Sequence, residues 1–344
     1  MAPFLFFDAN VAWFYRDGYP LGMDIKVYLL RRLAQGILTL FVVSIVIFGI
    51  LRITPGDVTD LIVSGEVASG FGIADKEKQE LRASFGLDRP IYLQYGEWVF
   101  DMATFSWGNS LFTERSVWDD FLQKLPVTLQ LSFMGLFIAI VLGLPLGIAA
   151  ALRQDTWVDY GARIFALGGV SVPHFWLATL FLLASVRYFT WSPPLGYVSA
   201  IDDPWGNFTQ FIWPALVLGY SGAGLLSRMM RSAVLEVIRQ EYIRTAMAKG
   251  LQPSVIVQRH ILKNALLPVI TVVGIGFATL VSGSVVLEQV FVLPGVGLFL
   301  LEAVKFRDYT VVQPIIVFFA AWVIMINLAV DVLYTWLNPQ VRHG

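Results

Sequence analysis

The chain has 344 residues, of which 57% are hydrophobic and only 14% are charged. Soluble domains have about 45–50% apolar and about 25% charged residues, so this composition excludes an ordinary soluble protein and indicates an integral membrane protein surrounded by lipid. The formal net charge of −1 gives no global basic field, and we expect no nucleic-acid partner. The absence of cysteine excludes disulfides and thiolate metal sites.

Residues 1–28 form an N-terminal extension, cytoplasmic or interfacial, ahead of the first apolar run. Residues 1–25 combine aromatic side chains with Asp8 and Asp17, unlike the n-region of a signal peptide. Either they form an interfacial segment, or Met23 is the true start of the chain. The apolar run that follows lacks a small-x-small cleavage site, which predicts a retained signal-anchor helix.

Six apolar segments come close to the length of about 20 residues that crosses the bilayer core. The fourth is the weakest, because Gly219, Gly222 and Gly224 lower its helix propensity, although glycine also permits close packing in membranes. The predicted fold class is therefore an all-α integral membrane protein with six transmembrane helices. In chain order these are 29–51, 128–152, 164–189, 212–230, 266–287 and 311–336.

Lysine and arginine residues in the loops predict the orientation. The stretch from Arg228 to Lys263 carries seven basic and two acidic residues, a net charge of +5, which indicates the cytoplasmic side. The long loop 52–127 is largely exempt from this rule and is assigned to the outside. Both termini are therefore predicted to be cytoplasmic.

The outer loop 52–127 is predicted to form a small, mainly helical extracytoplasmic cap. A charged helical pattern starts at Ala74, breaks at Gly86 and before Pro90, and resumes with near-helical spacing of apolar residues. The alternative is a solvated loop without a role. We favour the cap because long loops in compact proteins are usually functional or disordered, and this loop has too many aromatic residues for disorder.

Sequence motifs of several enzyme classes are absent. There is no Gly-x-x-x-x-Gly-Lys-Ser/Thr loop to cradle the phosphates of ATP, no His-Glu-x-x-His and no Gly-x-Ser-x-Gly. The three histidines are too few and too dispersed for a His-based metal site. We therefore expect no catalytic residue, no metal and no cofactor in this chain.

Charged residues of the predicted spans fall at or near their ends, which argues against an ion relay. His174, directly after Pro173, is the exception and is a candidate pathway residue; the alternative is a polar side chain satisfied by carbonyls that the proline frees. The chain therefore has no evident energy source, and uphill transport would need another chain. The charges near span ends are Arg52, Arg187, Arg228, Glu288 and Asp331.

The cytoplasmic segment 231–265 contains the charged, Ala-rich stretch EYIRTAMAKGL. The pattern predicts one helix from Leu225 to Lys249. Gly250 is placed to end it in a left-handed cap, and Pro253 to start a second helix that runs to about Asn264. A helix, tight turn and helix predict a rigid element that contacts a soluble partner. The alternative is a basic loop that only fixes orientation.

The heptapeptide RTAMAKG, residues 244–250, follows a Glu-Tyr pair and resembles the cytoplasmic signature of permease subunits of bacterial ABC importers. The form is that of the dipeptide, oligopeptide and nickel branch. This chain departs from the general signature at two places. His260 stands where the signature has an apolar residue, and Leu267-Pro268 comes about five residues later than the Leu-Pro pair of the signature. The longer spacing is habitual in this branch. The extension before Met23 departs from the family. Further stretches that resemble the branch, in order, include FGLDRPIYLQY, LPVTLQLS, SVPHFWLATL and KNALLPVIT.

The resemblance implies a multi-pass subunit of the bacterial inner membrane that forms half of the translocation pathway of an importer for peptides or related small solutes. Implied partners are a second homologous permease, two ATPase subunits or domains that bind ATP and Mg, and an extracytoplasmic solute-binding protein. Pro173, Pro268 and the Gly-rich fourth span are candidate flex points. The implied coupling helix, which sits in a cleft of the ATPase, comprises Glu241, Tyr242, Arg244, Thr245, Ala246, Lys249, Gly250 and Leu251.

The alternative function is a secondary carrier or channel that works alone. It would require an ion-coupling residue at mid-membrane or a polar pore lining. Apart from His174, the predicted spans offer neither. The residues leave the substrate open among a peptide, nickel, glutathione and an opine-like solute, because the resemblance implies that the binding protein largely selects the substrate.

Overall fold

The computed structural model describes residues 25–53, 89–194 and 196–337. The predicted extension, up to residue 24, and the part of the predicted cap between 54 and 88 lie outside the described residues. All regular elements in the described part are helices, which confirms the all-α prediction. They are α2 (Ile25–Ile53), α5 (Ile91–Ala103), α6 (Val117–Leu152), α7 (Trp157–Ser171), α8 (His174–Phe189), α9 (Pro204–Ile238), α10 (Glu241–Ala248), α11 (Pro253–Val255), the π-helix η1 (Ile256–Ile261), α12 (Leu262–Val290), α13 (Val296–Lys305) and α14 (Tyr309–Leu337).

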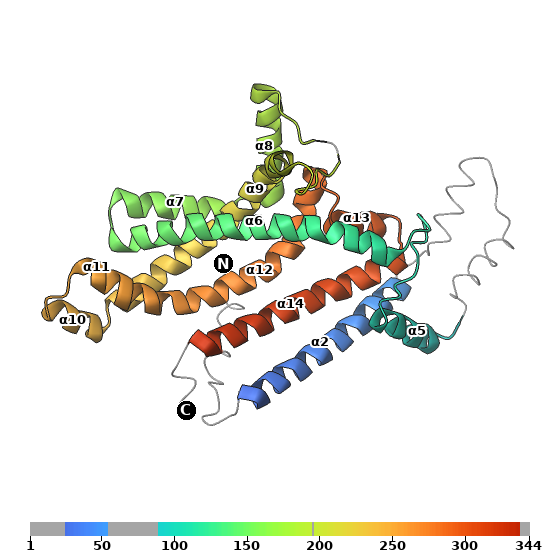
Figure 1. Ribbon diagram of the computed structural model, residues 1–344, viewed down its shortest axis with the longest axis horizontal. Coiled ribbons are helices and arrows are strands. Elements are labelled where there is room, and N and C mark those ends of the chain that lie inside the picture. Colours follow the sequence, from blue (N-terminus) through green and yellow to red (C-terminus); the bar gives the residue numbers. More distant parts are fainter. Residues whose placement is uncertain (1–24, 54–88, 195, 338–344) are drawn as a thin grey trace.

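The long helices run along the longest axis of the molecule, and short elements lie at the two ends (Figure 1). Helices α10 and α11 lie at one end. Helices α5 and α13 lie at the opposite end. The segment with the predicted coupling role therefore lies at the opposite end of the molecule from α5 and α13.

Within the described ranges, four helices are long and apolar enough to cross a membrane: Val27–Ile53, Val117–Leu152, Pro253–Val290 and Tyr309–Leu333. They contain the predicted first, second and fifth spans and residues 311–333 of the sixth. The second begins further out than the predicted boundary at 128, since the Ser116 hydroxyl accepts from the backbone N–H of Asp119 and caps the helix at Val117.

The predicted third span, 164–189, is wrong as a single helix. Helix α7 ends at Ser171, α8 begins at His174, and the two are bent by 101°. Val172 has the extended backbone (φ −91°, ψ 121°) that a following proline imposes, because the proline ring clashes with a helical predecessor. Counted as one broken span, the pair gives a fifth candidate.

The predicted fourth span, 212–230, lies inside α9, which has 35 residues. This helix is long enough to cross a membrane but is not among the helices that are also apolar enough. Six spans were predicted. By the length and hydropathy of the described helices, four single helices and one bent pair qualify as spans.

Glycines bring α6 and α9 into close contact. A Cβ atom at Gly147 would lie 2.5 Å from the Ser227 carbonyl oxygen, and one at Gly219 would lie 2.8 Å from that of Gly135. A Cβ at Gly224 would likewise lie 2.8 Å from the Ala166 carbonyl of α7. The glycines of the fourth predicted span thus allow backbone-to-backbone packing, and their role as flex points stays a prediction.

Candidate functional site

The predicted coupling helix is a separate element. Helix α9 ends at Ile238, Gln240 has an extended backbone (φ −71°, ψ 145°), and α10 begins at Glu241. The prediction of one helix from 225 to 249 is therefore wrong. The break turns α10 so that Ile243 and Ala246, one turn apart, are both buried against the body of the protein.

Gly250 ends α10 as predicted, with a φ of +76°. The N–H of Gly250 donates to the Met247 carbonyl at 2.9 Å, and the N–H of Leu251 donates to the Ala246 carbonyl at 3.4 Å. This pair of bonds is the Schellman motif, which satisfies carbonyls at the helix end and needs a left-handed residue. The tip of the element therefore has a defined backbone.

Pro253 starts the next helix as predicted, as the first residue of α11. The predicted end near Asn264 is wrong, because the chain continues through α11 and η1 directly into α12. The six residues Ile256–Ile261 are a π-helix, a geometry that is rare and often found at functional sites. The turn after Gly250 is thus joined without a loop to a membrane-length helix.

The coupling element has a buried face and an exposed face. Ile243 and Ala246 belong to a hydrophobic cluster with Met230 and Val234 of α9 and Ile256 of η1. The other predicted coupling residues are exposed to solvent, and these are Glu241, Tyr242, Arg244, Thr245, Lys249, Gly250 and Leu251. The arrangement presents a surface of charged, polar and apolar side chains on a base held by apolar packing, and assigns Ala246 to the base.

One side-chain hydrogen bond joins α10 to α12, and one ion pair lies within α10. The Tyr242 hydroxyl accepts from the Asn264 side-chain amide of α12 at 2.8 Å. Arg244 donates to the Glu241 carboxylate at 2.9 Å, but both side chains are largely exposed, so this ion pair contributes little. Sequence reasoning missed Asn264 and Ile243, since neither carries a signal until α10 and α12 are placed side by side.

A buried ion-pair cluster fixes α9 shortly before the coupling element. Asp159 of α7 is fully buried and accepts from Arg231 of α9 at 2.7 and 2.8 Å and from Arg163 at 3.0 and 2.5 Å. Two bidentate arginines on one carboxylate give a strong and directional contact. The spacing of four residues between Asp159 and Arg163 could have predicted their ion pair on one helix. Nothing in the sequence indicates that Arg231 joins it.

The candidate pathway and flex residues lie apart from the coupling element. Pro173 lies at the bend between α7 and α8, and His174 is the half-buried first residue of α8, where its side chain interacts with the backbone of Val217 on α9. Pro268 lies inside the continuous helix α12, so it does not break it.

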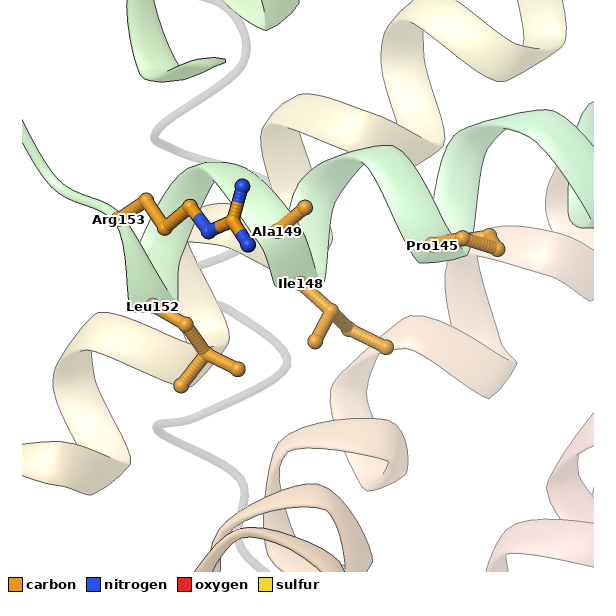
Figure 2. A pocket seen from close by; sticks show the side chains of 5 residues that line it. All are labelled: Pro145, Ile148, Ala149, Leu152 and Arg153. Atoms are coloured by element: carbon orange, nitrogen blue, oxygen red, sulfur yellow. The ribbon is translucent and has the colours of Figure 1, made fainter. Parts of the chain in front are cut away.

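A shallow groove of about 470 Å³ follows the last turns of α6, at the end where α10 also lies (Figures 1 and 2). Figure 2 shows that its lining comes from α6 and the residue after it: Pro145, Ile148, Ala149, Leu152 and Arg153. Apart from Arg153 the lining is apolar. The groove therefore has the character of a lipid-facing or protein-facing surface and offers no group for catalysis.

Two protein-family models match the chain. The binding-protein-dependent transport system inner membrane component matches residues 143–343, and the N-terminal component of the same kind matches residues 25–132. Together they cover the described part of the predicted cap, the coupling segment and the predicted spans, except residues 133–142 of the second span. The residues that precede 25 lie outside both matches.

Curated relatives match over nearly their whole length. The di/tripeptide transport system permease protein DppB of Pseudomonas aeruginosa is 37% identical over 337 residues, 92% of this chain and 98% of that protein. The dipeptide transport system permease protein DppB of Alkalihalophilus pseudofirmus is 36% identical, over 92% and 99%. A Brucella abortus relative with a provisional name as a peptide transport system permease is 39% identical, over 92% and 98%.

Among solved structures, the inward-facing MetNI methionine ABC transporter has a TM-score of 0.50 at 23% identity, over 63% of this chain and 96% of that chain. At this identity the likeness concerns the fold alone, which is that of a membrane subunit of a transporter. The family models and the length of the alignments to permease proteins agree with it. The chain belongs to the family of binding-protein-dependent transport system inner membrane components, and is a multi-pass membrane protein of that family.

Proposed function

We propose that the chain is the permease subunit of an ATP-driven importer for peptides. It pairs with a second homologous permease, and each forms half of the translocation pathway. Two ATPase subunits or domains bind ATP and Mg below, and an extracytoplasmic solute-binding protein delivers the peptide above. The names of the DppB relatives support the substrate class, and the family description supports the binding protein.

The observation that carries the proposal is the exposed tip between α10 and α11. Its base is packed through Ile243 and Ala246, its turn is closed by the Schellman motif at Gly250, and it continues into α12 without a loop. A partner that moves the tip would therefore move a membrane-length helix. We assign the contact with the ATPase to the exposed coupling residues around Arg244 and Lys249.

The mechanism follows from linkage between two states. ATP-driven closure of the ATPase dimer brings the two docked tips together, and the attached helices tilt from an inward-open to an outward-open pathway. Since the ATPase binds the tip differently in the two states, each cycle of hydrolysis shifts the permease equilibrium. The bend at Pro173 and the proline at position 268 are flex points of this movement.

The membrane topology belongs to the same proposal. The chain crosses the membrane six times, with α7 and α8 as one broken span and α9 as the fourth, polar one. The tip and both termini are cytoplasmic, which the excess of seven basic over two acidic residues between Arg228 and Lys263 supports. The cap, of which α5 is the described helix, faces outward and helps to dock the binding protein.

Reconstitution into vesicles tests the function. The chain, its second permease, the ATPases and the binding protein are expected to take up a radiolabelled dipeptide only when ATP and Mg are supplied on the ATPase side. The purified chain alone is expected to hydrolyse no ATP and to transport nothing. Dipeptide uptake by the chain alone, driven by an ion gradient, would instead support the stand-alone carrier.

A further inference from the structure

Glu288 lies in the last turn of α12 and is fully buried. Its carboxylate accepts hydrogen bonds from α6, from α13 and from one residue of α12 itself. One carboxylate oxygen, Oε1, accepts from the Thr128 hydroxyl of α6 at 2.7 Å and from the Ser284 hydroxyl at 3.0 Å. The other, Oε2, accepts from the backbone N–H of Leu298 in α13 at 2.9 Å.

The same carboxylate completes the start of α13. The first N–H groups of a helix have no partner inside that helix, and Gly295, which precedes α13, has no side chain to cap them. The N–H of Val296 donates to the Thr128 hydroxyl at 2.8 Å, and the N–H of Leu298 donates to Glu288. The cap of α13 is thus supplied by two other helices, α6 and α12.

The glycines around α13 leave the space that this arrangement needs. A Cβ atom at Gly295 would lie 2.4 Å from the Glu288 carboxyl group, and one at Gly297 would lie 2.9 Å from its Oε2 and 2.7 Å from the Cα of Val285. Since real Cβ atoms do not approach so closely, the carboxylate can reach the start of α13 only past glycines. The sequence Glu-Gln-Val-Phe-Val-Leu-Pro-Gly-Val-Gly is built for this contact.

We infer that Glu288 is a positioning residue that makes α6, α12 and α13 move as one body in transport. The inference rests on the proposed function, because α12 follows the coupling tip through α11 and η1 and runs roughly 40 Å, at 1.5 Å per residue, from Leu262 to the Glu288 contact. Movement of the tip therefore reaches α13 through one helix and one carboxylate. Without the carboxylate, α12 would tilt while α13 stays behind.

To hold the three helices together, Glu288 needs to accept hydrogen bonds but does not need to carry a charge. Two substitutions distinguish these properties. In Glu288→Gln the amide oxygen still accepts from Leu298, and the hydroxyls of Thr128 and Ser284 can turn to accept from the amide nitrogen. In Glu288→Met the side chain keeps its length but leaves buried donors unpaired. We expect dipeptide uptake by the reconstituted complex to fall about tenfold or more in Glu288→Met and to stay within about threefold of wild type in Glu288→Gln.

A control substitution and a distance measurement between α12 and α13 distinguish loss of this contact from general misfolding. Glu302→Gln makes the same chemical change on the exposed side of α13 and is expected to behave as wild type. Spin labels at the exposed positions 286 on α12 and 304 on α13 report whether the two helices stay together, and we expect a broader distance distribution in Glu288→Met and in Thr128→Val. Thr128→Ser, which keeps the hydroxyl, is expected to restore the narrow one.

Three outcomes overturn the inference. Equal loss of uptake in Glu288→Gln and Glu288→Met would show that a carboxylate charge is needed, as in a proton relay. If the distance distribution between the labels at positions 286 and 304 were unchanged in Glu288→Met, the carboxylate would not hold α13. If the variants lost complex assembly together with uptake, and Thr128→Ser were no better than Thr128→Val, the contact would serve folding alone. Failure of the wild-type complex to couple ATP to uptake would instead refute the proposed function and leave the distance measurement valid.

Discussion

Gly250 makes the strictest demand on residue type in the coupling tip. Its φ of +76° places it in the left-handed region, while an added Cβ would meet no atom within 4 Å. A side chain at this position therefore costs only backbone strain, about 1–2 kcal/mol for an ordinary L-residue. The strain falls on the turn and not on the packed body of the protein.

Substitutions at Gly250 should therefore affect coupling more than folding. We expect Gly250→Val to reach the membrane in normal amount and to lose most ATP-driven peptide uptake, because a β-branched residue disrupts the Schellman turn. Gly250→Asn is the matched control, since asparagine tolerates left-handed backbone. Uptake assays normalised to membrane abundance check this, and equal uptake by the two variants would show that the turn geometry does not matter.

The role of a single residue could be predicted from the sequence when it depends on that residue's own backbone, and not when it depends on a partner far along the chain. Gly250 and Pro253 act through their own backbone, and both predictions agree with the structure. Glu288 looked like a charge at the end of a span, because its key partner Thr128 lies 160 positions away. Ile243 likewise becomes an anchor only when α10 turns back on α9 and η1.

At the scale of elements, glycines set how closely α6 and α9 approach. Gly147 faces backbone atoms, with the Ser227 carbonyl oxygen 2.5 Å and the Met230 Cβ 2.8 Å from an added Cβ. We expect Gly147→Val to force the helices apart and to destabilise the protein by about 1–3 kcal/mol, as overpacking does. Thermal unfolding in detergent measures this.

Gly161 of α7 provides the matched control for that prediction, since an added Cβ there would meet nothing within 4 Å. Gly161→Ala should leave stability unchanged or raise it slightly, because alanine favours helices. If both variants unfolded at the same temperature as wild type, close packing by glycine would not stabilise the α6–α9 pair.

The elements themselves were predictable where apolar runs are long, and less so where helices break. The runs within α2, α6, α12 and α14 needed only hydropathy. The break at Gln240 has no glycine or proline to mark it, and comes from the packing of α10 against the body. The bend at Pro173 had a local signal, but the apolar residues on both sides favoured one span.

On the scale of the whole molecule, the proposed topology places α5 and α10 on opposite sides of the membrane. We expect a reporter enzyme that is active only outside the cytoplasm to show activity when inserted at Ser106, between α5 and α6. The same reporter fused to the C-terminus is expected to be inactive, because the positive segment around the tip holds that side in the cytoplasm. Activity at the C-terminus would invert the topology.

The central claim is that the tip at Lys249 receives the work of ATP hydrolysis, and its most direct test is a cross-link. The chain contains no cysteine, so Lys249→Cys provides a single thiol at the tip, and Gln154→Cys, exposed in the turn after α6, provides a control at the same end. In the assembled complex, a short thiol-to-amine cross-linker should join Lys249→Cys to an ATPase subunit and change that yield when ATP binds. An ATPase adduct from Gln154→Cys but none from Lys249→Cys would contradict the account.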